Sequence, residues 1–367
     1  MQKPSPNPQI QTAIGLMSGT SLDGIDAALI RTDGLDFVEP VAFYTCPYTA
    51  DLREKLRACL GLSHDPDGRV AAAEAAMTHA HGLAVKALLD LSHMRAGQID
   101  LIGFHGQTLF HDPANRFTWQ IGDGAALARQ TSIPVVNDFR TADVKAGGQG
   151  APLIPVYHAA LAHSLSKPVA ILNIGGVANV TLIDEQKNVL AFDVGPGNAL
   201  INDWIHRHTG EEYDPDGSYA RKGIVDTQSL SRLLQNVFFE ARPPKSLDRD
   251  AWNVSFLSGM GLEDGAATLT AFTVKAIALS LEHMPVKPVA WYVTGGGRLN
   301  KKIMDDLQAT LGVPVKSVDE LGWDGDALEA QGFAYLAVRS RLGLPLSFPT
   351  TTAVSEPMTG GRYWDAA

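Results

Sequence analysis

The stretch AIGLMSGTSLDGIDAALI, residues 13–30, decides the fold of this chain. An apolar run enters a turn of Gly, Ser, Thr and Asp, and a second apolar run leaves it. This pattern predicts two buried strands joined by a polar hairpin. Glycines in the turn let the backbone approach a ligand closely, and its hydroxyls and amides suit a phosphate. An ordinary surface hairpin uses the same residue types, so both interpretations stay open here.

Acidic residues add to the case for a phosphate at this turn. Asp23 and Asp26 place negative charge where the phosphate would bind, which favours a divalent cation bound with it. The chain contains no GxxxxGK[ST] pattern, so the turn is not a Walker loop.

A second copy of this unit begins at residue 169. The stretch VAILNIGGVANVTLI, residues 169–183, repeats the order of apolar strand, glycine-bearing turn and apolar strand. Each hairpin is followed by a third strand, over residues 37–44 and 189–192, and then by alternating strands and helices, which indicates an α/β fold. An internal repeat of this size predicts a duplicated, two-lobed molecule.

The length of 367 residues also indicates two domains. We expect a disordered tail over residues 1–11, an N-terminal lobe over 12–150, a C-terminal lobe over 151–342 and an extended C-terminal segment over 343–367. The Gly- and Pro-rich stretch 138–155 is expected to form a long loop at the junction of the lobes.

Composition excludes several classes of function. The net charge of −10, without any Lys/Arg-rich block, argues against a nucleic-acid surface. Two cysteines, Cys46 and Cys59, are too few for a disulfide framework or a metal knuckle, which fits a reducing cytoplasm. The N-terminus has no apolar signal core and no apolar run is long enough for a membrane span, so we expect a cytoplasmic protein without a membrane partner.

A later strand, residues 289–293, runs into the triple glycine of VTGGGRLN, and a helix is expected from about residue 300. Two strand–turn–strand units followed by such a glycine turn resemble the actin-like ATPase superfamily. In that superfamily the two hairpin turns hold the phosphates from opposite lobes, and the glycine turn binds the adenosine.

Further motifs narrow the resemblance. GFHGQT, TWQIGDG, NDFRTADVKAGGQGAPL and FDVGPGN look like motifs of the anhydro-N-acetylmuramic acid kinase family, and the resemblance extends from about residue 14 to about residue 339. One position departs from it, since Phe104 stands where the family's GSHGQT has serine.

The resemblance implies a fold and a reaction. The fold is a two-lobed actin-like ATPase (duplicated ribonuclease H-like) fold, with nucleotide and sugar in the cleft between the lobes. The enzyme would use ATP and Mg²⁺ to open the 1,6-anhydro ring of 1,6-anhydro-N-acetylmuramic acid with water and to phosphorylate O6. The products would be N-acetylmuramic acid 6-phosphate and ADP, in peptidoglycan recycling, and a homodimer is compatible with this assignment.

The resemblance also implies which residues bind the nucleotide and its cation. Asp23 is the candidate metal ligand, and Asn300 is a candidate for both ribose binding and helix capping. The full set of expected nucleotide contacts is Gly19, Thr20, Ser21, Leu22, Asp23, Gly24, Ile25, Asp26, Asn173, Gly175, Gly176, Asn179, Gly195, Gly197, Asn198, Gly295, Gly296, Gly297 and Asn300.

Asp193 is the candidate general base. It follows the apolar run VLAF and precedes Gly195 and Gly197, so its carboxylate can project from a strand end while the glycines let a substrate come close. The alternative is that Asp193 caps a helix that starts with Pro196 in its first turn.

Sugar contacts are expected mainly from the N-terminal lobe. Arg140 suits the lactyl carboxylate of a muramic acid, because guanidinium binds carboxylates bidentately; the alternative is an ion pair with Asp138 or Asp143. Glu329 is either a substrate contact or part of a solvated helix face. The remaining candidates lie where strands end or in the motifs of the resemblance: His105, Gln107, Thr108, Gln120 and Asp138.

Two other classes of function compete with this assignment. Another small-molecule kinase or an ATPase of the same superfamily would keep the phosphate turns without opening a sugar, but it would not need the GFHGQT and DFR…GGQG segments. A glycoside hydrolase would pair Asp193 with Asp138 or Asp143, but it would leave two phosphate turns without a role.

Overall fold

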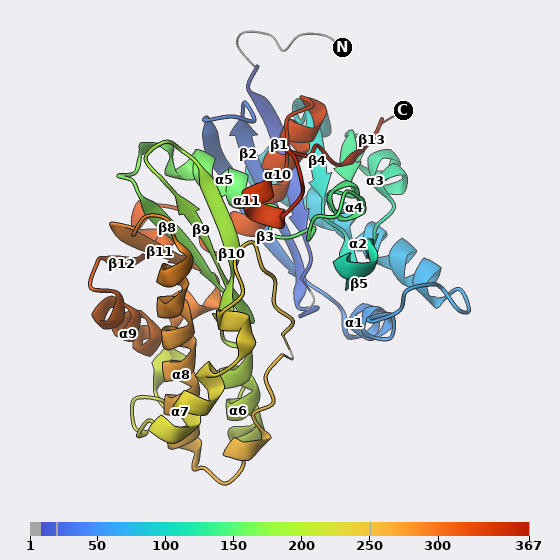
Figure 1. The fold of residues 1–367 in the computed structure, drawn as a ribbon. Helices are drawn as coiled ribbons and strands as arrows, with labels where there is room; N and C mark the ends of the chain where they lie inside the picture. The colour runs from blue at the N-terminus through green and yellow to red at the C-terminus, as the bar shows by residue number, and fades with distance from the viewer. Residues whose placement is uncertain (1–8, 20, 250, 367) are drawn as a thin grey trace. The chain divides into compact units, whose positions relative to one another are not determined.

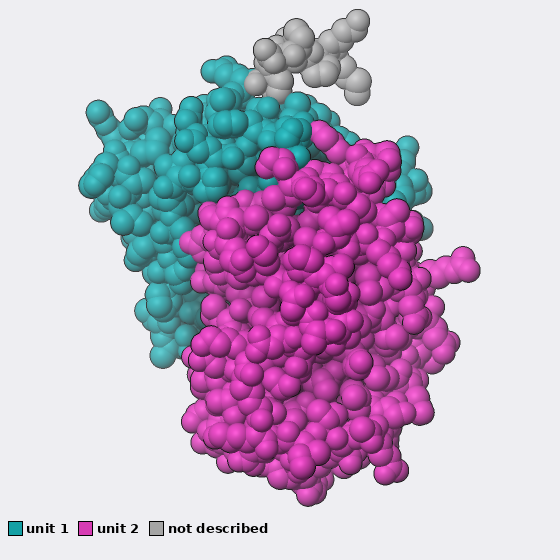
Figure 2. All heavy atoms as spheres, turned by 90° about the vertical axis from the view of Figure 1, so that its left-hand side faces the viewer, with its two compact units in different colours: residues 1–163, 327–367 teal, residues 164–326 magenta. Residues whose placement is uncertain are grey.

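The computed structural model describes residues 9–19, 21–249 and 251–366, and the chain divides into two compact units (Figures 1 and 2). Unit 1 comprises residues 1–163 and 327–367, and unit 2 comprises residues 164–326. The division therefore differs from the predicted boundaries after residues 150 and 342. Of the expected disordered tail, residues 1–8 lie outside the described part, and Gln11 already belongs to the first strand.

Unit 1 is built from two separate stretches of the chain, residues 1–163 and 327–367 (Figure 1). Its strands and helices are β1 (Gln11–Met17), β2 (Gly24–Thr32), β3 (Val38–Pro47), α1 (Ala50–Arg57), α2 (Arg69–Ser92), β4 (Leu101–Phe104), β5 (Gln107–Asp112), β6 (Phe117–Ile121), α3 (Gly124–Thr131), β7 (Val135–Asn137), α4 (Thr141–Lys145), α5 (Pro155–Leu161), α10 (Leu328–Arg341), α11 (Pro349–Thr352) and β13 (Arg362–Trp364).

Unit 2 is one continuous stretch of chain. Its elements are β8 (Val169–Ile174), β9 (Val177–Ile183), β10 (Val189–Pro196), α6 (Ala199–Thr209), α7 (Thr227–Leu234), α8 (Leu262–Leu279), β11 (Ala290–Thr294), α9 (Lys301–Leu311) and β12 (Val315–Ser317).

The two main sheets repeat one strand order. In unit 1 the order is β3-β2-β1-β4-β7, with β13 added beside β7, and in unit 2 it is β10-β9-β8-β11-β12. In both sheets the first three strands pair antiparallel and the next two pairings are parallel. This is the duplicated ribonuclease H-like plan of the actin-like ATPases, so the predicted fold class is confirmed.

The chain returns to unit 1 with helix α10, which packs closely on the sheet because two glycines leave room for it. Gly15 on β1 is paired with Gly103 on β4, and α10 packs against both strands and against β2. A Cβ at Gly15 would lie 1.7 Å from the carbonyl oxygen of Ala330, and one at Gly103 would lie 2.0 Å from that of Phe333. Only glycine permits this close packing of helix on sheet.

The core of unit 2 lies between its sheet and the helices α6 and α8. Leu172 and Val180 of the sheet are fully buried and form one cluster with Trp204 of α6 and Phe272 of α8. Figure 1 shows α6, α7 and α8 grouped together beside the sheet. The alternating apolar strands and the apolar helix faces therefore pair as the sequence pattern predicts.

Two predictions about loops are wrong. The stretch 138–155 is not one long loop, because α4 lies within it and α5 begins at its end. The segment after residue 342 is not simply extended, since it forms α11 and the strand β13, which pairs with β7. Both regions look irregular in the sequence because short elements stabilised by contacts with distant residues have weak local signals.

Candidate functional site

Polar side chains of unit 2 form a row across its sheet. Asp193 on β10 is paired with Asn179 on β9, and Asn179 is paired with Asn173 on β8. Thr294 on β11 extends the row, because it is paired with Asn173. Directly opposed residues share a face of the sheet. The candidate base and two of the expected phosphate contacts therefore lie on one face of unit 2.

Asp193 is partly buried and held by a segment that the sequence did not connect with it. Its Oδ2 accepts a hydrogen bond of 2.7 Å from the amide of Leu247, and its own amide donates to the carbonyl of Lys245 at 3.0 Å. Burial raises the pKa of Asp193 to about 7, while the Leu247 hydrogen bond opposes the increase. A carboxylate with this pKa can accept a proton near neutral pH.

The alternative role of Asp193 as a helix cap is wrong. Strand β10 continues through Asp193 and ends at Pro196, so neither residue starts a helix. The next helix, α6, is preceded instead by Asn198, whose side chain donates to the carbonyl of Ile174 at 2.9 Å. Asp193 therefore lies within a strand, where the apolar run that precedes it placed it.

The glycines expected to bind nucleotide fall into two groups. A Cβ at Gly19, Gly175, Gly176 or Gly296 would meet no atom of the chain closer than 3.5 Å. Packing within the unit requires the others, because a Cβ would come within 3 Å of neighbouring atoms at Gly24, Gly195, Gly197, Gly295 and Gly297. The first group leaves backbone open toward space that the chain does not fill, as a bound phosphate or nucleotide would need.

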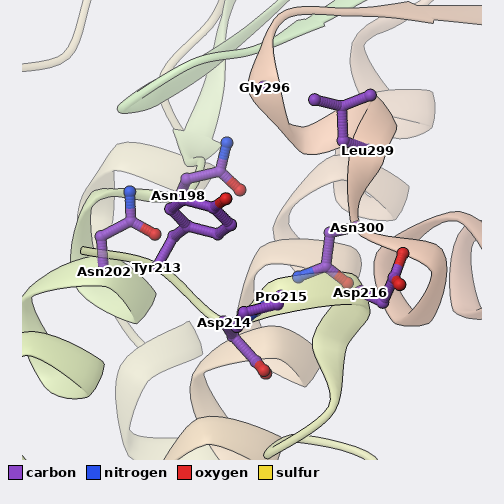
Figure 3. Close-up of a pocket in the computed structure, with 9 residues that line it drawn as sticks. All are labelled: Asn198, Asn202, Tyr213, Asp214, Pro215, Asp216, Gly296, Leu299 and Asn300. Atoms are coloured by element: carbon purple, nitrogen blue, oxygen red, sulfur yellow. The ribbon is translucent and has the colours of Figure 1, made fainter. Parts of the chain in front are cut away.

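A cavity of about 490 Å³ opens beside the glycine turn of unit 2 (Figure 3). Three expected contacts line it, namely Asn198, Gly296 and Asn300. Figure 3 shows Asn202 and Tyr213 on one side of the cavity and Leu299 and Asn300 on the other. Asn300 also caps α9 by accepting from the amide of Ile303 at 3.1 Å, so one of its two expected roles is confirmed.

Six further residues line this cavity and are not predicted by the sequence motifs: Asn202, Tyr213, Asp214, Pro215, Asp216 and Leu299. They belong to α6, to the loop after it and to the glycine turn. The glycine turn lies more than eighty residues further along the chain than the other two segments. Tyr213 and Leu299 are 60% and 61% exposed, an exposure that the folded structure reveals and the sequence does not.

Arg298 fixes the glycine turn from within. Its guanidinium donates to both carboxylate oxygens of Asp326 and to Oδ2 of Asp319, each at 2.9 Å. It also donates to the carbonyl of Gly295 at 3.2 Å. The Arg298 side chain is only 5% exposed, whereas the carboxylates of Asp319 and Asp326 are 47% and 65% exposed, so the guanidinium is held from the inside by carboxylates at the surface. The turn is thereby held in place for a ligand.

The first turn of unit 1 links β1 to β2. Thr20, one of its expected contacts, lies outside the described residues. Ser21 and Asp23 are exposed, while Leu22 and Ile25 are buried and face the core. Leu22 has a left-handed backbone with φ of 59°, which is rare for a bulky residue and typical of turns constrained by function.

Arg140 and His105 form a pair at the ends of β7 and β4. The Nη2 and Nε atoms of Arg140 lie 3.0 and 3.3 Å from Nε2 of His105, and Nη1 donates to the carbonyl of Gly150 at 2.7 Å. Burial lowers the pKa of His105 to about 3, so the imidazole is neutral and accepts from the guanidinium. Its Nδ1 donates to the carbonyl of Gly106.

Arg140 keeps its charge but has no carboxylate partner within the described part of the chain. Burial lowers its pKa to about 10, which still leaves it protonated at neutral pH, and Glu329 and Asp143 oppose the decrease. The alternative of an ion pair with Asp138 or Asp143 is therefore wrong: neither comes within ion-pair distance of the guanidinium. A partly buried guanidinium without an ion pair attracts an anion.

Glu329 does not belong to a solvated helix face. It lies at the start of α10 and is partly buried. Burial raises its pKa, Arg140 opposes that change and Asp26 reinforces it, so the three charged groups act on one another. Glu329 therefore joins the Arg140 region of unit 1.

The other expected sugar contacts are separated by the structure. Gln107 is fully buried and accepts from the hydroxyl of Ser18 at 2.7 Å, so its burial does not support a direct sugar contact. Gln120 lies on β6, in the small sheet β5-β6, and not at the edge of the main sheet. Within the small sheet its Nε2 donates to the hydroxyls of Thr108 and Thr118. Asp138, with a left-handed φ of 57°, and Gln120 line a second cavity of about 330 Å³.

Phe104, at the position where serine was expected, is fully buried in β4. Its ring packs against His81, with ring centroids 4.8 Å apart, and would touch a Cβ at Gly122. The phenyl ring therefore fills core space beneath the strand, and position 104 carries no hydroxyl.

A divalent cation would find a sparse set of ligands here. The described residues contain no group of three His, Cys, Asp or Glu side chains placed to hold a metal ion. Mg²⁺ commonly uses one or two carboxylates together with phosphate oxygens and water, so an exposed carboxylate such as Asp23 fits that need. No helix in the described ranges is long and apolar enough to cross a membrane.

Comparison with known proteins supports one family throughout. Residues 11–365 match the sequence profile of anhydro-N-acetylmuramic acid kinase. The chain is 53% identical to a protein of that name from Rhizorhabdus wittichii over 95% of this chain and 97% of the relative. It is 51% identical to one from Rhodospirillum rubrum, over 97% and 94% of the two chains.

Among solved structures, the chain is similar to ligand-bound xylulose kinase from Lactobacillus acidophilus, at 11% identity, with a TM-score of 0.47 over 96% of this chain and 93% of that one. The family match covers every motif described above, from the first hairpin to β13. The chain belongs to the anhydro-N-acetylmuramic acid kinase family.

Proposed function

We propose that this protein opens the 1,6-anhydro bridge of 1,6-anhydro-N-acetylmuramic acid with water and phosphorylates the freed O6 with ATP. Water adds to the anomeric carbon, the bond from that carbon to the bridging oxygen breaks, and this oxygen takes the γ-phosphoryl group. The products are N-acetylmuramic acid 6-phosphate and ADP. Family membership supports the kinase activity, and the sites in the two units support the assignment of roles.

The observation that carries this proposal is the environment of Asp193. Water must lose a proton as it attacks the sugar, and a base with a pKa near the working pH removes that proton efficiently. Burial raises the pKa of Asp193 to about 7, and the Leu247 amide orients one carboxylate oxygen. We assign the general base to Asp193.

Arg140 is assigned to the lactyl carboxylate of the sugar. The guanidinium is charged, partly buried and without an ion pair in the described ranges, which supports an anionic ligand. Guanidinium and carboxylate match in a planar, bidentate geometry. Glu329, held in the same region, is assigned to a sugar hydroxyl.

The nucleotide is assigned to unit 2. Its cavity, the open glycines 175, 176 and 296, and the residues Asn198 and Asn300 support adenosine and phosphate binding there. Tyr213 offers an exposed ring for stacking on the base. Mg²⁺, when bound, would offset the charge of the phosphates, with Asp23 as the candidate ligand.

A glycoside hydrolase is less well supported. Asp143, one of the carboxylates that it would pair with Asp193, is only 2% exposed and accepts from Gly150, Ser347 and Thr352. Both oxygens of Asp143 are therefore bound by donors of unit 1, which does not support it as the partner carboxylate of a hydrolase. Such an enzyme would also leave the open glycine turns of unit 2 unexplained.

The test is a product assay with ATP, Mg²⁺ and 1,6-anhydro-N-acetylmuramic acid in ¹⁸O-water, read by mass spectrometry. We expect a sugar 6-phosphate that carries the label at its anomeric oxygen. ADP without sugar phosphate would instead indicate another ATPase of the superfamily. Ring opening without ADP would indicate a hydrolase.

A further inference from the structure

The C-terminal segment of unit 1 is linked to Arg140 through the buried carboxylate of Asp143. Asp143 lies on α4, three residues after Arg140, and is 2% exposed. Its Oδ1 accepts from the amide of Gly150 at 2.7 Å, and its Oδ2 accepts from the hydroxyls of Ser347 and Thr352. Both residues belong to the segment 343–367: Thr352 is the last residue of α11, and Ser347 lies two residues before this helix.

The loop between α4 and α5 is built around this carboxylate. Gly148 lies so close that a Cβ there would be 2.1 Å from Oδ1 of Asp143, and its amide donates to the Asp143 carbonyl at 2.9 Å. Gly150 has a left-handed φ of 69°. These glycines let the GGQG segment fold over a carboxylate that a side chain would otherwise displace.

The same loop also holds the guanidinium of Arg140. The carbonyl of Gly150 accepts from Nη1 of Arg140 at 2.7 Å, while its amide donates to Asp143. A second link runs from the amide of Gln149 to the carbonyl of Thr352 at 2.6 Å. One residue, Gly150, thus connects the buried carboxylate to the guanidinium through its two adjacent peptide groups.

We propose that Asp143 is a positioning residue for Arg140, and that Ser347 and Thr352 of the C-terminal segment complete this positioning. The inference rests on the proposed role of Arg140 in binding the sugar carboxylate. Asp143 never contacts the substrate. The three donors hold the Asp143 carboxylate in one orientation, and this carboxylate in turn fixes the position of Gly150. The carbonyl of Gly150 then orients the guanidinium of Arg140, whose remaining N–H groups stay available for the anion.

The arrangement explains features that packing alone leaves unexplained. A buried carboxylate costs free energy unless it is fully hydrogen-bonded, and here three neutral donors supply those bonds. An apolar side chain would fill the same space at no such cost. The carboxylate occurs here together with the GGQG segment and two hydroxyl residues more than 200 positions away.

The test compares Ser347→Ala and Thr352→Val with Ser340→Ala. The control also removes a hydrogen bond of the C-terminal segment, from Ser340 to the carbonyl of Gly360, but not one to Asp143. We expect each test variant to raise the KM for 1,6-anhydro-N-acetylmuramic acid about fivefold, the effect of one lost hydrogen bond of about 1 kcal/mol. The KM for ATP should stay within about twofold, and Ser340→Ala should change neither.

A second measurement separates positioning from a purely structural role. In the Arg140→Ala background, Ser347→Ala should raise the sugar KM no further, because the group that it positions is gone. Equal effects in both backgrounds, or unchanged sugar KM in Ser347→Ala and Thr352→Val, would overturn the inference while the role of Arg140 stands. Failure of the proposed function is distinct: Arg140→Ala alone would then leave the sugar KM unchanged.

Discussion

At the scale of single residues, the protonation state of Asp193 determines how activity depends on pH. The base must be ionised to accept the proton of water, and its pKa is about 7. We expect kcat/KM to rise with pH through about 7 and to level off above it. Asp193→Asn should abolish turnover and leave ATP binding close to that of the wild type. An active Asp193→Asn protein would contradict the assignment of the base.

The same residue makes stability depend on pH. The pKa of Asp193 is raised from 3.8 to about 7, so the folded state binds the proton more tightly than the unfolded state. Its contribution to the free energy of unfolding is therefore present below about pH 4 and is lost as pH rises through about 7. Asp193→Asn should gain about 2 kcal/mol relative to the wild type between pH 5 and pH 8. Urea unfolding at both pH values measures this gain, and a constant difference would contradict it.

Arg140 is expected to act on the sugar and not on the nucleotide. Its guanidinium has only neutral hydrogen-bond partners among the described residues, His105 and the Gly150 carbonyl. Arg140→Ala should raise the sugar KM at least about 30-fold, the loss of a charged hydrogen-bonded pair of about 2 kcal/mol, with little change in the ATP KM. Arg140→Lys serves as the control, since it keeps the charge but loses the bidentate fork. Equal increases in both KM values would exclude this role.

Two glycines of unit 2 that lie close together in space allow a role in ligand binding to be distinguished from a role in packing. A Cβ at Gly176 would lie 3.7 Å from its nearest neighbour, the Cβ of Ala199, whereas one at Gly197 would lie 2.2 Å from the carbonyl oxygen of Gly175. Gly176→Ala should leave stability unchanged and raise the ATP KM several-fold, while Gly197→Ala should lose about 2 kcal/mol of stability. Steady-state kinetics and urea unfolding distinguish the two, and a stable Gly197→Ala protein would be inconsistent with this packing.

At the scale of the elements, the packing of α10 on the sheet of unit 1 depends on Gly15 and Gly103. A Cβ at Gly15 would lie 1.7 Å from a backbone oxygen of α10, which cannot move independently of the helix. Gly15→Ala should therefore cost about 3 kcal/mol of stability. Gly97→Ala is the control, because a Cβ there meets nothing within 4 Å. Equal stabilities of the two variants in urea unfolding would contradict the requirement for close packing.

The elements also show where sequence patterns suffice. Hairpins β1-β2 and β8-β9, the long helices α2 and α8, and the cap of α9 at Asn300 carry strong local signals, namely apolar runs, helical periodicity and cap residues. Strands β5 and β13 and helix α4 were missed. Each is short. Strand β13 and helix α4 also depend on contacts with other chain segments that no local pattern contains, whereas β5 pairs with the next strand, β6.

At the scale of the whole molecule, unit 1 is built from two separate stretches of chain. Residues 327–367 supply α10, which covers the sheet, and β13, which extends it. A chain that ends at residue 326 should lose the fold of unit 1 and keep that of unit 2, which is one continuous stretch. Limited proteolysis with mass spectrometry should then find residues 164–326 protected and residues 11–163 cleaved. Protection of residues 11–163 would contradict this dependence.

The sequence by itself determined the duplicated plan, the positions of the glycine turns and the family, because all of these are local patterns that recur in a fixed order along the chain. Only the tertiary structure decided which of the expected residues remain accessible. Gln107 is buried, Glu329 joins Arg140, and Leu247 holds Asp193 across fifty-four positions. Burial and hydrogen bonding between distant segments arise from packing, and they determine the pKa values and orientations on which the chemistry depends.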